Sequence, residues 1–259
     1  MTDEPVTIFI TGTAGAGKSS FSQSFGVWLN NNNYDSTIVN MDPGASDDES
    51  SSFDIDIREW IDIAQVMEKY KLGVNGAQIV AADLITLHIN EIKEEIDKIK
   101  GAYTIIDTPG QIELFYLRES GQVVIDSLGN KRSVICFLYD PFISASPSIF
   151  MSLRTMALLM EFRFSIPMIN ILSKSDLISD KKNEKVREWM MNSNMLFEDM
   201  SIESPSMNRE MAMNLLKLFD ELDISSTIIP TSSKNYTGMD VIYGLIQELF
   251  HAGEDLEKI

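Results

Sequence analysis

The chain has one cysteine and two histidines among its 259 residues, so it lacks the side chains for an internal disulfide or a cysteine–histidine zinc site. No apolar run reaches the ~18 residues that a membrane-spanning helix requires. The opening stretch MTDEPVTIFI has no basic region ahead of an apolar one, and we therefore expect no secretory signal. These absences predict a soluble, cytoplasmic protein that does not contact a membrane.

Basic residues are also scarce, with 21 Lys and Arg against 39 Asp and Glu and a formal net charge of −18. An acidic surface repels the phosphate backbone of nucleic acids, so we expect no direct nucleic-acid partner. Basic protein partners stay open. The remaining composition, 44% hydrophobic and 23% charged, is that of an ordinary globular chain.

Short apolar, β-branched runs alternate with amphipathic segments along the chain. This alternation predicts an α/β fold, a mainly parallel sheet with helices on both faces. Strands are expected near 6–11, 37–41, 103–107, 133–139, 168–172 and 227–230. Helices are expected near 18–30, 57–70, 77–99, 113–128, 148–164, 182–191, 207–222 and 239–250. We interpret the helical stretch at about 56–100 as an insertion between the second and third strands of one domain, 1–259, and the acidic stretch 46–52 as a mobile loop.

The sequence GTAGAGKSS fits the P-loop pattern G-x-x-x-x-G-K-S/T, and it lies between a predicted strand and a predicted helix as that motif requires. Glycines allow the backbone N–H groups to face a phosphate, and the helix N-terminus adds its positive end. Lys18 would reach the β- and γ-phosphates, and Ser19 would offer its hydroxyl to Mg²⁺. The predicted phosphate-binding residues are Gly12, Ala14, Gly15, Ala16, Gly17, Lys18, Ser19 and Ser20.

The stretch LSKSDL follows the fifth predicted strand and indicates which base is bound. A carboxylate at Asp176 can accept from the ring N–H and the amine of guanine, and the stem of Lys174 can cover the base. Ser173 stands where many GTPases have Asn or Thr and is a weaker match. The later stretch PTSSK follows the last strand, where the N–H of Ser233 could meet the guanine carbonyl.

Two further stretches follow predicted strands, YTIIDTPGQIE and NMDPGAS. In the first, Asp107 would hold Mg²⁺ through water, Gly110 would present its N–H to the γ-phosphate, and Gln111 and Glu113 would orient the attacking water. In the second, we favour a role for Asp42 in placing magnesium or water. The alternatives are a turn leading into an acidic helix start, and an ordinary Asp-Pro turn.

The motifs GTAGAGKSS, NMDPG, LGVNGA, DTPGQIE and LSKSDL, in this order, resemble those of the GPN-loop GTPases, most closely the archaeal type. The resemblance implies Mg²⁺-dependent hydrolysis of GTP to GDP and phosphate by a P-loop domain, and a homodimer or a heterodimer of related chains. In that family a Gly-Pro-Asn turn of one subunit enters the active site of the other. Here the turn is Gly73, Val74 and Asn75, and valine in place of proline makes it less rigid. The resemblance implies that Asn75 acts in trans.

Several alternatives stay open or are disfavoured. Asn75 could instead be a helix N-cap, with Gln78 three residues later as in a capping box. No arginine adjoins the phosphate motifs to serve as an obvious finger within the chain, which favours a neutral amide from a partner. Thr13 stands where deviant P-loop ATPases have an extra lysine, and Lys174 with Asp176 argues against a nucleotide kinase. A nucleotide-gated assembly factor with negligible turnover, acting on an unidentified protein client, stays open.

Overall fold

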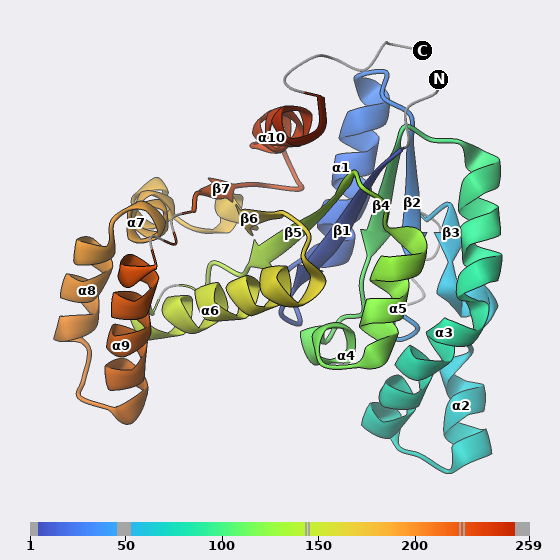
Figure 1. The fold of residues 1–259 in the computed structure, drawn as a ribbon, viewed down its shortest axis with the longest axis horizontal. Helices are drawn as coiled ribbons and strands as arrows, with labels where there is room; N and C mark the ends of the chain where they lie inside the picture. Colours follow the sequence, from blue (N-terminus) through green and yellow to red (C-terminus); the bar gives the residue numbers. More distant parts are fainter. Residues whose placement is uncertain are drawn as a thin grey trace.

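The structure is a computed structural model that describes residues 5–45, 53–142, 144, 146–222, 224 and 226–251. The predicted mobile loop at 46–52 lies outside these residues. A seven-stranded sheet in the order β3-β2-β4-β1-β5-β6-β7 forms the centre of the molecule, and every strand pairing described is parallel (Figure 1). The strands are β1 Val6–Gly12, β2 Ser36–Asn40, β3 Ile55–Asp56, β4 Tyr103–Asp107, β5 Ser133–Tyr139, β6 Met168–Leu172 and β7 Ile228–Pro230.

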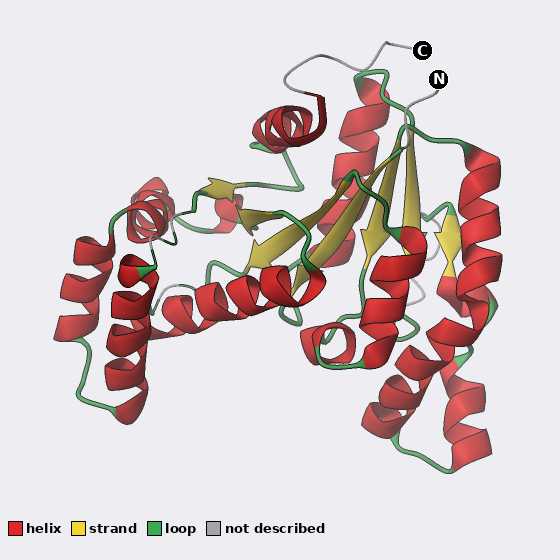
Figure 2. Cartoon of the chain, in the orientation of Figure 1, coloured by secondary structure: helices red, strands yellow, loops and turns green. Residues whose placement is uncertain are grey.

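Helices lie on both sides of this sheet, as Figure 2 shows, and the predicted fold class is confirmed. The α-helices are α1 Lys18–Asn31, α2 Ile63–Tyr70, α3 Val74–Ile99, α4 Ile112–Tyr116, α5 Glu119–Leu128, α6 Pro147–Phe164, α7 Asp180–Met191, α8 Ser193–Ile202, α9 Met207–Glu221 and α10 Met239–His251. The described residues also form the 3-10 turns η2 Ile57–Glu59 and η3 Ser175–Leu177.

The strands are apolar almost throughout because both faces of the sheet are covered. Alternate residues of β1 enter different cores: Ile8 and Ile10 pack with α1 and α10, whereas Phe9 packs with α3, α5 and α6 on the opposite face. Residues of β1, β4 and β5 are all buried. The central strands are therefore fixed by two-sided burial, and their carboxyl ends form a firm base for the loops of the site.

Several predicted boundaries were wrong for local reasons. The sequence prediction missed β3 and α8; β3 has only two residues, too few to show a periodic pattern. The helix predicted at 57–70 is split into η2 and α2, because Asp62 caps a new start by accepting from the N–H groups of Ala64 and Gln65. The helix predicted at 113–128 is split into α4 and α5. There the α5 backbone passes so close to α4 that a Cβ at Gly121 would lie 1.8 Å from the Phe115 carbonyl oxygen.

Among the described residues, no single helix has the length and apolar character to cross a bilayer. In the part of the chain that the structure describes, α2 and α3 taken together reach that length and composition, and the chain bends by 109° between them.

Candidate nucleotide-binding site

The P-loop connects β1 to α1 at the carboxyl edge of the sheet. Gly12 has φ 145° and lies against β5, where a Cβ would come within 2.6 Å of the Leu138 carbonyl oxygen. Gly17 begins α1 in the left-handed region at φ 90°, with no side-chain cap and no acidic residue in the first helical turn. The first N–H groups of α1 therefore have no competing side-chain acceptor, which favours an anion at this helix end.

Lys18 is 6% exposed and turns back over this loop. Its ammonium donates to the carbonyl oxygens of Gly12 at 3.0 Å and Thr13 at 3.1 Å, and to the Gly110 oxygen at 2.8 Å. Burial lowers the pKa of Lys18, and the carboxylates of Asp107, Asp42 and Glu113 oppose that shift. The structure thus brings the P-loop lysine together with three acidic residues that the sequence assigned to the site.

The predicted magnesium ligands have the oxygen chemistry that this ion prefers. Ser19 lies in the first turn of α1, and Asp107 is 1% exposed at the end of β4, next to β1 in the sheet. No group of three or more His, Cys, Asp or Glu in the described part of the chain could enclose a metal. A hydroxyl and one carboxylate fit Mg²⁺, which is commonly held by one or two protein oxygens together with substrate phosphates.

Asp42 follows β2 in residues 41–45, the Asp42 loop, and it joins this loop to residues 108–111, the Gly110 loop. Its Oδ1 accepts from the N–H of Gly44 at 2.8 Å, and its Oδ2 accepts from the N–H of Gly110 at 2.6 Å. The N–H that the sequence analysis assigned to the γ-phosphate therefore donates to Asp42 in this structure. Since Gly110 also accepts from Lys18, a continuous run of hydrogen bonds links the P-loop, the Gly110 loop and the Asp42 loop.

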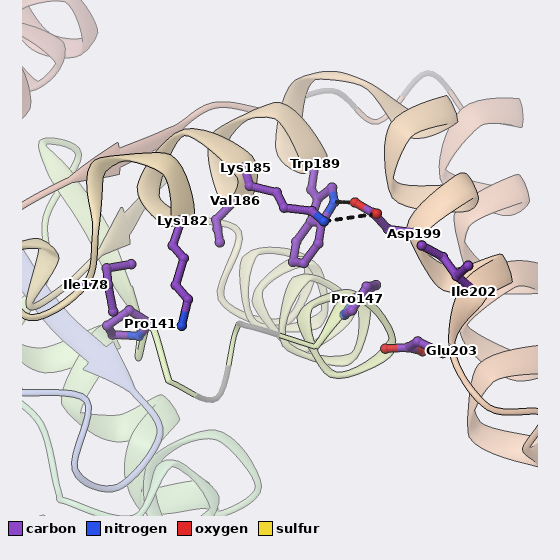
Figure 3. Close-up of a pocket in the computed structure, with 10 residues that line it drawn as sticks. All are labelled: Pro141, Pro147, Ile178, Lys182, Lys185, Val186, Trp189, Asp199, Ile202 and Glu203. Carbon is purple, nitrogen blue, oxygen red and sulfur yellow. Dashed lines mark hydrogen bonds and ion pairs between the residues drawn. The ribbon is translucent and has the colours of Figure 1, made fainter.

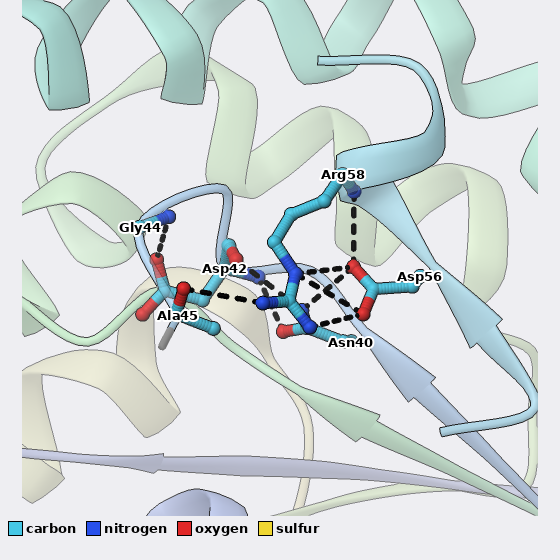
Figure 4. A network of polar contacts seen from close by, with 6 residues as sticks. All are labelled: Asn40, Asp42, Gly44, Ala45, Asp56 and Arg58. Atoms are coloured by element: carbon cyan, nitrogen blue, oxygen red, sulfur yellow. Dashed lines mark hydrogen bonds and ion pairs between the residues drawn. The ribbon is translucent and has the colours of Figure 1, made fainter. Parts of the chain in front are cut away.

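An arginine from thirteen residues further along the chain lies beside the loop that follows Asp42. Arg58 donates through Nη1 to the Ala45 oxygen at 3.2 Å and makes a forked pair with Asp56 (Figure 4). Asp56 in turn accepts from Asn40, the last residue of β2. Sequence reasoning missed this arginine because it reaches the Asp42 loop only through the unrecognised strand β3.

The loop after β4 and the start of α3 meet in the same chain. Gln111 is the N-cap residue of α4, and its amide donates to the Gln78 side chain at 3.1 Å; Glu113 is exposed in the first turn of α4. Helix α3 begins at Val74 with Gly73 as its N-cap and no side-chain cap. The capping alternative for Asn75 is therefore wrong, and Asn75 is an exposed residue of the first turn of α3.

The predicted base-binding loops lie on the other side of β1. Lys174 Nζ pairs with Asp140 Oδ2 at 2.8 Å and also donates to the carbonyl oxygen of Gly15 in the P-loop. Asp176 is exposed in η3. Asp140 was not among the predicted site residues, although it follows β5 in a strand-end Asp-Pro pair like that of Asp42.

Hydrogen bonds tie these base-side loops to each other and to α1. Ser175 N–H donates to the Thr231 oxygen at 2.9 Å, and the hydroxyl of Ser24 in α1 donates to the Ser233 oxygen at 3.0 Å. The two predicted guanine-contacting loops and the P-loop helix thus form one connected edge. Their arrangement leaves the exposed Asp176 carboxylate available to a ligand.

A separate cavity of about 380 Å³ lies beside α7 and α8 (Figure 3). Its wall includes Trp189, whose indole N–H donates to Asp199 at 2.6 Å, and Lys185, which pairs with the same carboxylate at 3.0 Å. None of the site residues predicted from the sequence lines this cavity. The nucleotide machinery is therefore not in this hollow but on the loops at the strand ends.

The fold and these loops define a P-loop nucleotide-binding protein. Residues 10–252 match a family described as "Conserved hypothetical ATP binding protein". The chain is 28% identical to GPN-loop GTPase PAB0955 of Pyrococcus abyssi over 97% of its own length and 99% of that relative. The crystal structure of PAB0955, described as a GTPase in apo form, superposes with a TM-score of 0.83 over 94% of this chain and 96% of that one.

Some eukaryotic relatives are longer. The chain is 27% identical to GPN-loop GTPase 1 of Dictyostelium discoideum over 99% of its own length, but it spans only 65% of that relative. It is 33% identical to GPN-loop GTPase 1 of Saccharomyces cerevisiae over 71% of its own length and 48% of the relative. The chain belongs to the GPN-loop GTPase family, as the motifs indicated.

Proposed function

We propose that this chain binds GTP with Mg²⁺ and hydrolyses it to GDP and phosphate. The observation that carries the proposal is the run of hydrogen bonds from Lys18 through Gly110 to Asp42, which joins a P-loop to two acidic strand-end loops. The matched family is described by ATP, whereas the relatives are named GTPases. We favour guanine because Lys174 lies over the P-loop and Asp176 is exposed beside it.

Binding a triphosphate would rearrange hydrogen bonds that the structure describes. The ammonium of Lys18 would leave its carbonyl partners for the β- and γ-phosphate oxygens. The N–H of Gly110 would pass from Asp42 to the γ-phosphate, and the Asp42 carboxylate would then be available to water or metal. Ser19 and Asp107 would hold Mg²⁺, which neutralises charge on the phosphates.

Hydrolysis then depends on placing a water molecule in line with the γ-phosphate. Asp42, Gln111 and Glu113 gather near the same edge and offer acceptors that can orient that water. Each has a side-chain oxygen that can accept a hydrogen bond from the attacking water, and none needs to form a covalent bond with the substrate. We expect each to affect the rate of hydrolysis more than the affinity for GTP.

The proposal includes a homodimer in which Asn75 enters the partner's site. The contact between Gln78 and Gln111 places the start of α3 beside the catalytic loop. Next to Asn75, Val74 is 56% exposed and Ile79 is 40% exposed, which is an apolar surrounding suited to contact with a second copy. A neutral amide delivered there could orient water without adding charge.

Mixing two inactive variants tests the trans assignment. In a mixed dimer of Lys18→Ala and Asn75→Ala chains, the only site that binds GTP belongs to the Asn75→Ala subunit and faces an intact Asn75. Restored hydrolysis in the mixture supports action in trans. If Asn75→Ala is inactive alone and mixing restores nothing, Asn75 acts within its own chain, which the contact between Gln78, three residues along α3, and Gln111 also permits.

A second function is favoured by the exchange of partners at Gly110. Because the γ-phosphate and Asp42 would compete for one N–H, GTP can switch the loops without fast turnover, as in a nucleotide-gated assembly factor with a protein client. Single-turnover hydrolysis separates the two functions. A half-life of many hours for bound GTP, with or without dimerisation, would favour the switch over the enzyme.

A further inference from the structure

Arg58 anchors a side-chain network behind the Asp42 loop. Its Nε donates to Asp56 Oδ1 at 2.9 Å and its Nη2 to Asp56 Oδ2 at 2.6 Å. From the same guanidinium, Nη1 reaches across to the carbonyl oxygen of Ala45 at 3.2 Å. Figure 4 shows the guanidinium between η2 and the far end of the Asp42 loop. A planar fork that holds a carboxylate and a carbonyl at once is a geometry that arginine provides and lysine does not.

Asp56 passes this anchoring on to Asn40. The Asn40 amide nitrogen donates to Asp56 Oδ1 at 2.9 Å, which turns the amide oxygen of Asn40 toward the N–H of Asp42 at 2.9 Å. If the amide were reversed, its NH₂ group would meet the Asp42 N–H, and two donors would face each other. The Asp56 carboxylate therefore sets the orientation of Asn40, and Asn40 sets the backbone of Asp42.

The network is buried and charged, so losing one partner would leave a buried polar group without its hydrogen bond, which is costly. Asn40 is fully buried and Asp56 is 8% exposed. Burial by itself would raise the pKa of Asp56, but hydrogen bonds from Arg58 and Asn40 outweigh it, and the net shift is downward. Arg58 thus keeps a nearly buried carboxylate ionised at the point where it accepts hydrogen bonds from Asn40 and from Arg58 itself.

We propose that Arg58 is a positioning residue that fixes the Asp42 loop through Asp56 and Asn40, and also directly at Ala45. It grips the loop at both ends: at the start through Asn40 and Asp42, and at the end through the Ala45 oxygen. Asp42 is thereby held where its carboxylate meets the N–H of Gly110. The catalytic part of this assignment rests on the proposed GTP hydrolysis, whereas the structural part does not.

The chain offers a matched control. Arg118 makes a forked pair with Asp83 through Nε and Nη2, so Arg118→Ala removes the same kind of ion pair from the junction of α3 and α5. Arg118 is not part of the network behind Asp42. Arg58→Lys keeps the positive charge and serves as a second variant if Arg58→Ala folds poorly.

The first measurement is amide hydrogen exchange over residues 41–45 in the full chain without nucleotide. We expect Arg58→Ala to speed exchange of this loop by about tenfold or more, because a loop held by charged hydrogen bonds opens more often once they are lost. Arg58→Lys should give a smaller increase, and Arg118→Ala none. Unchanged exchange over 41–45 in Arg58→Ala overturns the proposal, whatever happens to hydrolysis.

The second measurement is single-turnover hydrolysis at saturating GTP, together with GTP affinity. We expect Arg58→Ala to slow hydrolysis by about tenfold, to raise GTP affinity by no more than Asp42→Ala does, and to have no further effect when Asp42 is already alanine. An additional tenfold loss in the Asp42→Ala background would mean that Arg58 acts on the phosphate itself, and would overturn the positioning role. If the wild type does not hydrolyse GTP, the proposed function fails, and the exchange measurement still decides the role of Arg58.

Discussion

The loops on both sides of β1 continue the sheet through main-chain hydrogen bonds, but the contacts added beyond the sheet differ: Lys174 joins the base side to the P-loop, whereas the Asp42 carboxylate joins two loops on the phosphate side. Ser173 N–H donates to the Tyr139 oxygen at 3.0 Å and Thr231 N–H to the Leu172 oxygen at 2.8 Å, so the base side continues the order of the sheet. The phosphate side has a tie of the same kind, from the Met41 N–H to the Asp107 oxygen at 2.8 Å, and beyond it the Asp42 carboxylate and the amides of Gln78 and Gln111 join the loops.

The difference lies in the Asp42 contact, which occupies a backbone N–H that a γ-phosphate would also use. A main-chain tie survives most substitutions, because every residue except proline supplies the same donor and acceptor. A side-chain tie is lost with its residue, and a phosphate can compete for its donor. We therefore expect single substitutions on the base side to change which base binds, and those on the phosphate side to change hydrolysis and the response to GTP.

The largest effect should come from Lys18→Ala, which removes the cation between the two sides. Lys18 is the buried ammonium that reaches both the P-loop and Gly110. Its loss should weaken GTP binding by about 1,000-fold, roughly 4 kcal/mol, when titrated by calorimetry. Lys181→Ala, an exposed lysine of α7, is the control and should bind normally. Unchanged GTP affinity in Lys18→Ala would remove the basis for the phosphate assignment.

Asp176→Asn should change which base is bound. The substitution replaces an acceptor by a donor at the predicted guanine contact, so we expect a loss of about 2 to 3 kcal/mol in GTP affinity and a gain for xanthosine triphosphate. Asp180→Asn, on an exposed residue at the start of α7, is the control. Competition binding with the three triphosphates of guanine, xanthine and adenine measures the change. A wild type that binds ATP as tightly as GTP would refute guanine selection.

Asp42→Ala should change both GTP affinity and the rate of hydrolysis, because Asp42 lies on the phosphate side of the site. It frees the N–H of Gly110 for a γ-phosphate, which GDP lacks, so affinity for GTP should rise by up to about tenfold while GDP affinity changes less. Hydrolysis should slow by at least about tenfold, because a water-orienting group is lost. Asp54→Ala is the control, since Asp54 accepts an N–H within β2 and not at the site. Equal changes in GTP and GDP affinity would contradict the competition at Gly110.

Most of the sheet and the P-loop could be predicted from the sequence, because their patterns lie within short continuous segments. The apolar runs of β4, β5 and β6 predicted their bounds residue for residue, since burial on both faces leaves few polar positions. The P-loop is a continuous motif, so its geometry follows from neighbouring residues.

The connections between loops could not be predicted in the same way. Arg58 reaches Ala45 across thirteen positions and a two-residue strand, and Asp140 meets Lys174 across thirty-four. Such contacts depend on which strands are neighbours in the sheet, and no pattern in one segment encodes that. The start of α3 was misplaced by three residues, because the expected asparagine cap lies inside a helix that Gly73 begins.

The smallest effect is on the free energy of unfolding, and it tests whether the Asn75 side chain stabilises the fold. Asn75 is exposed and does not cap α3, whereas Asn192 caps α8 by accepting from the N–H groups of Asn194 and Met195. Asn192→Ala should therefore lower the free energy of unfolding by about 1 kcal/mol. Asn75→Ala should change it by less than about 0.5 kcal/mol, within the usual range for a surface substitution.

Urea unfolding of the two variants, at one protein concentration and without nucleotide, makes this comparison. If Asn75→Ala unfolds like the wild type, the Asn75 side chain is not needed for stability and can serve in catalysis. The mixed-dimer assay then shows whether it acts in its own chain or in the partner. If Asn75→Ala instead loses as much stability as Asn192→Ala, the side chain supports the start of α3. A slower hydrolysis by that variant would then follow from a displaced Gln78 and Gln111, not from a missing amide at the phosphate.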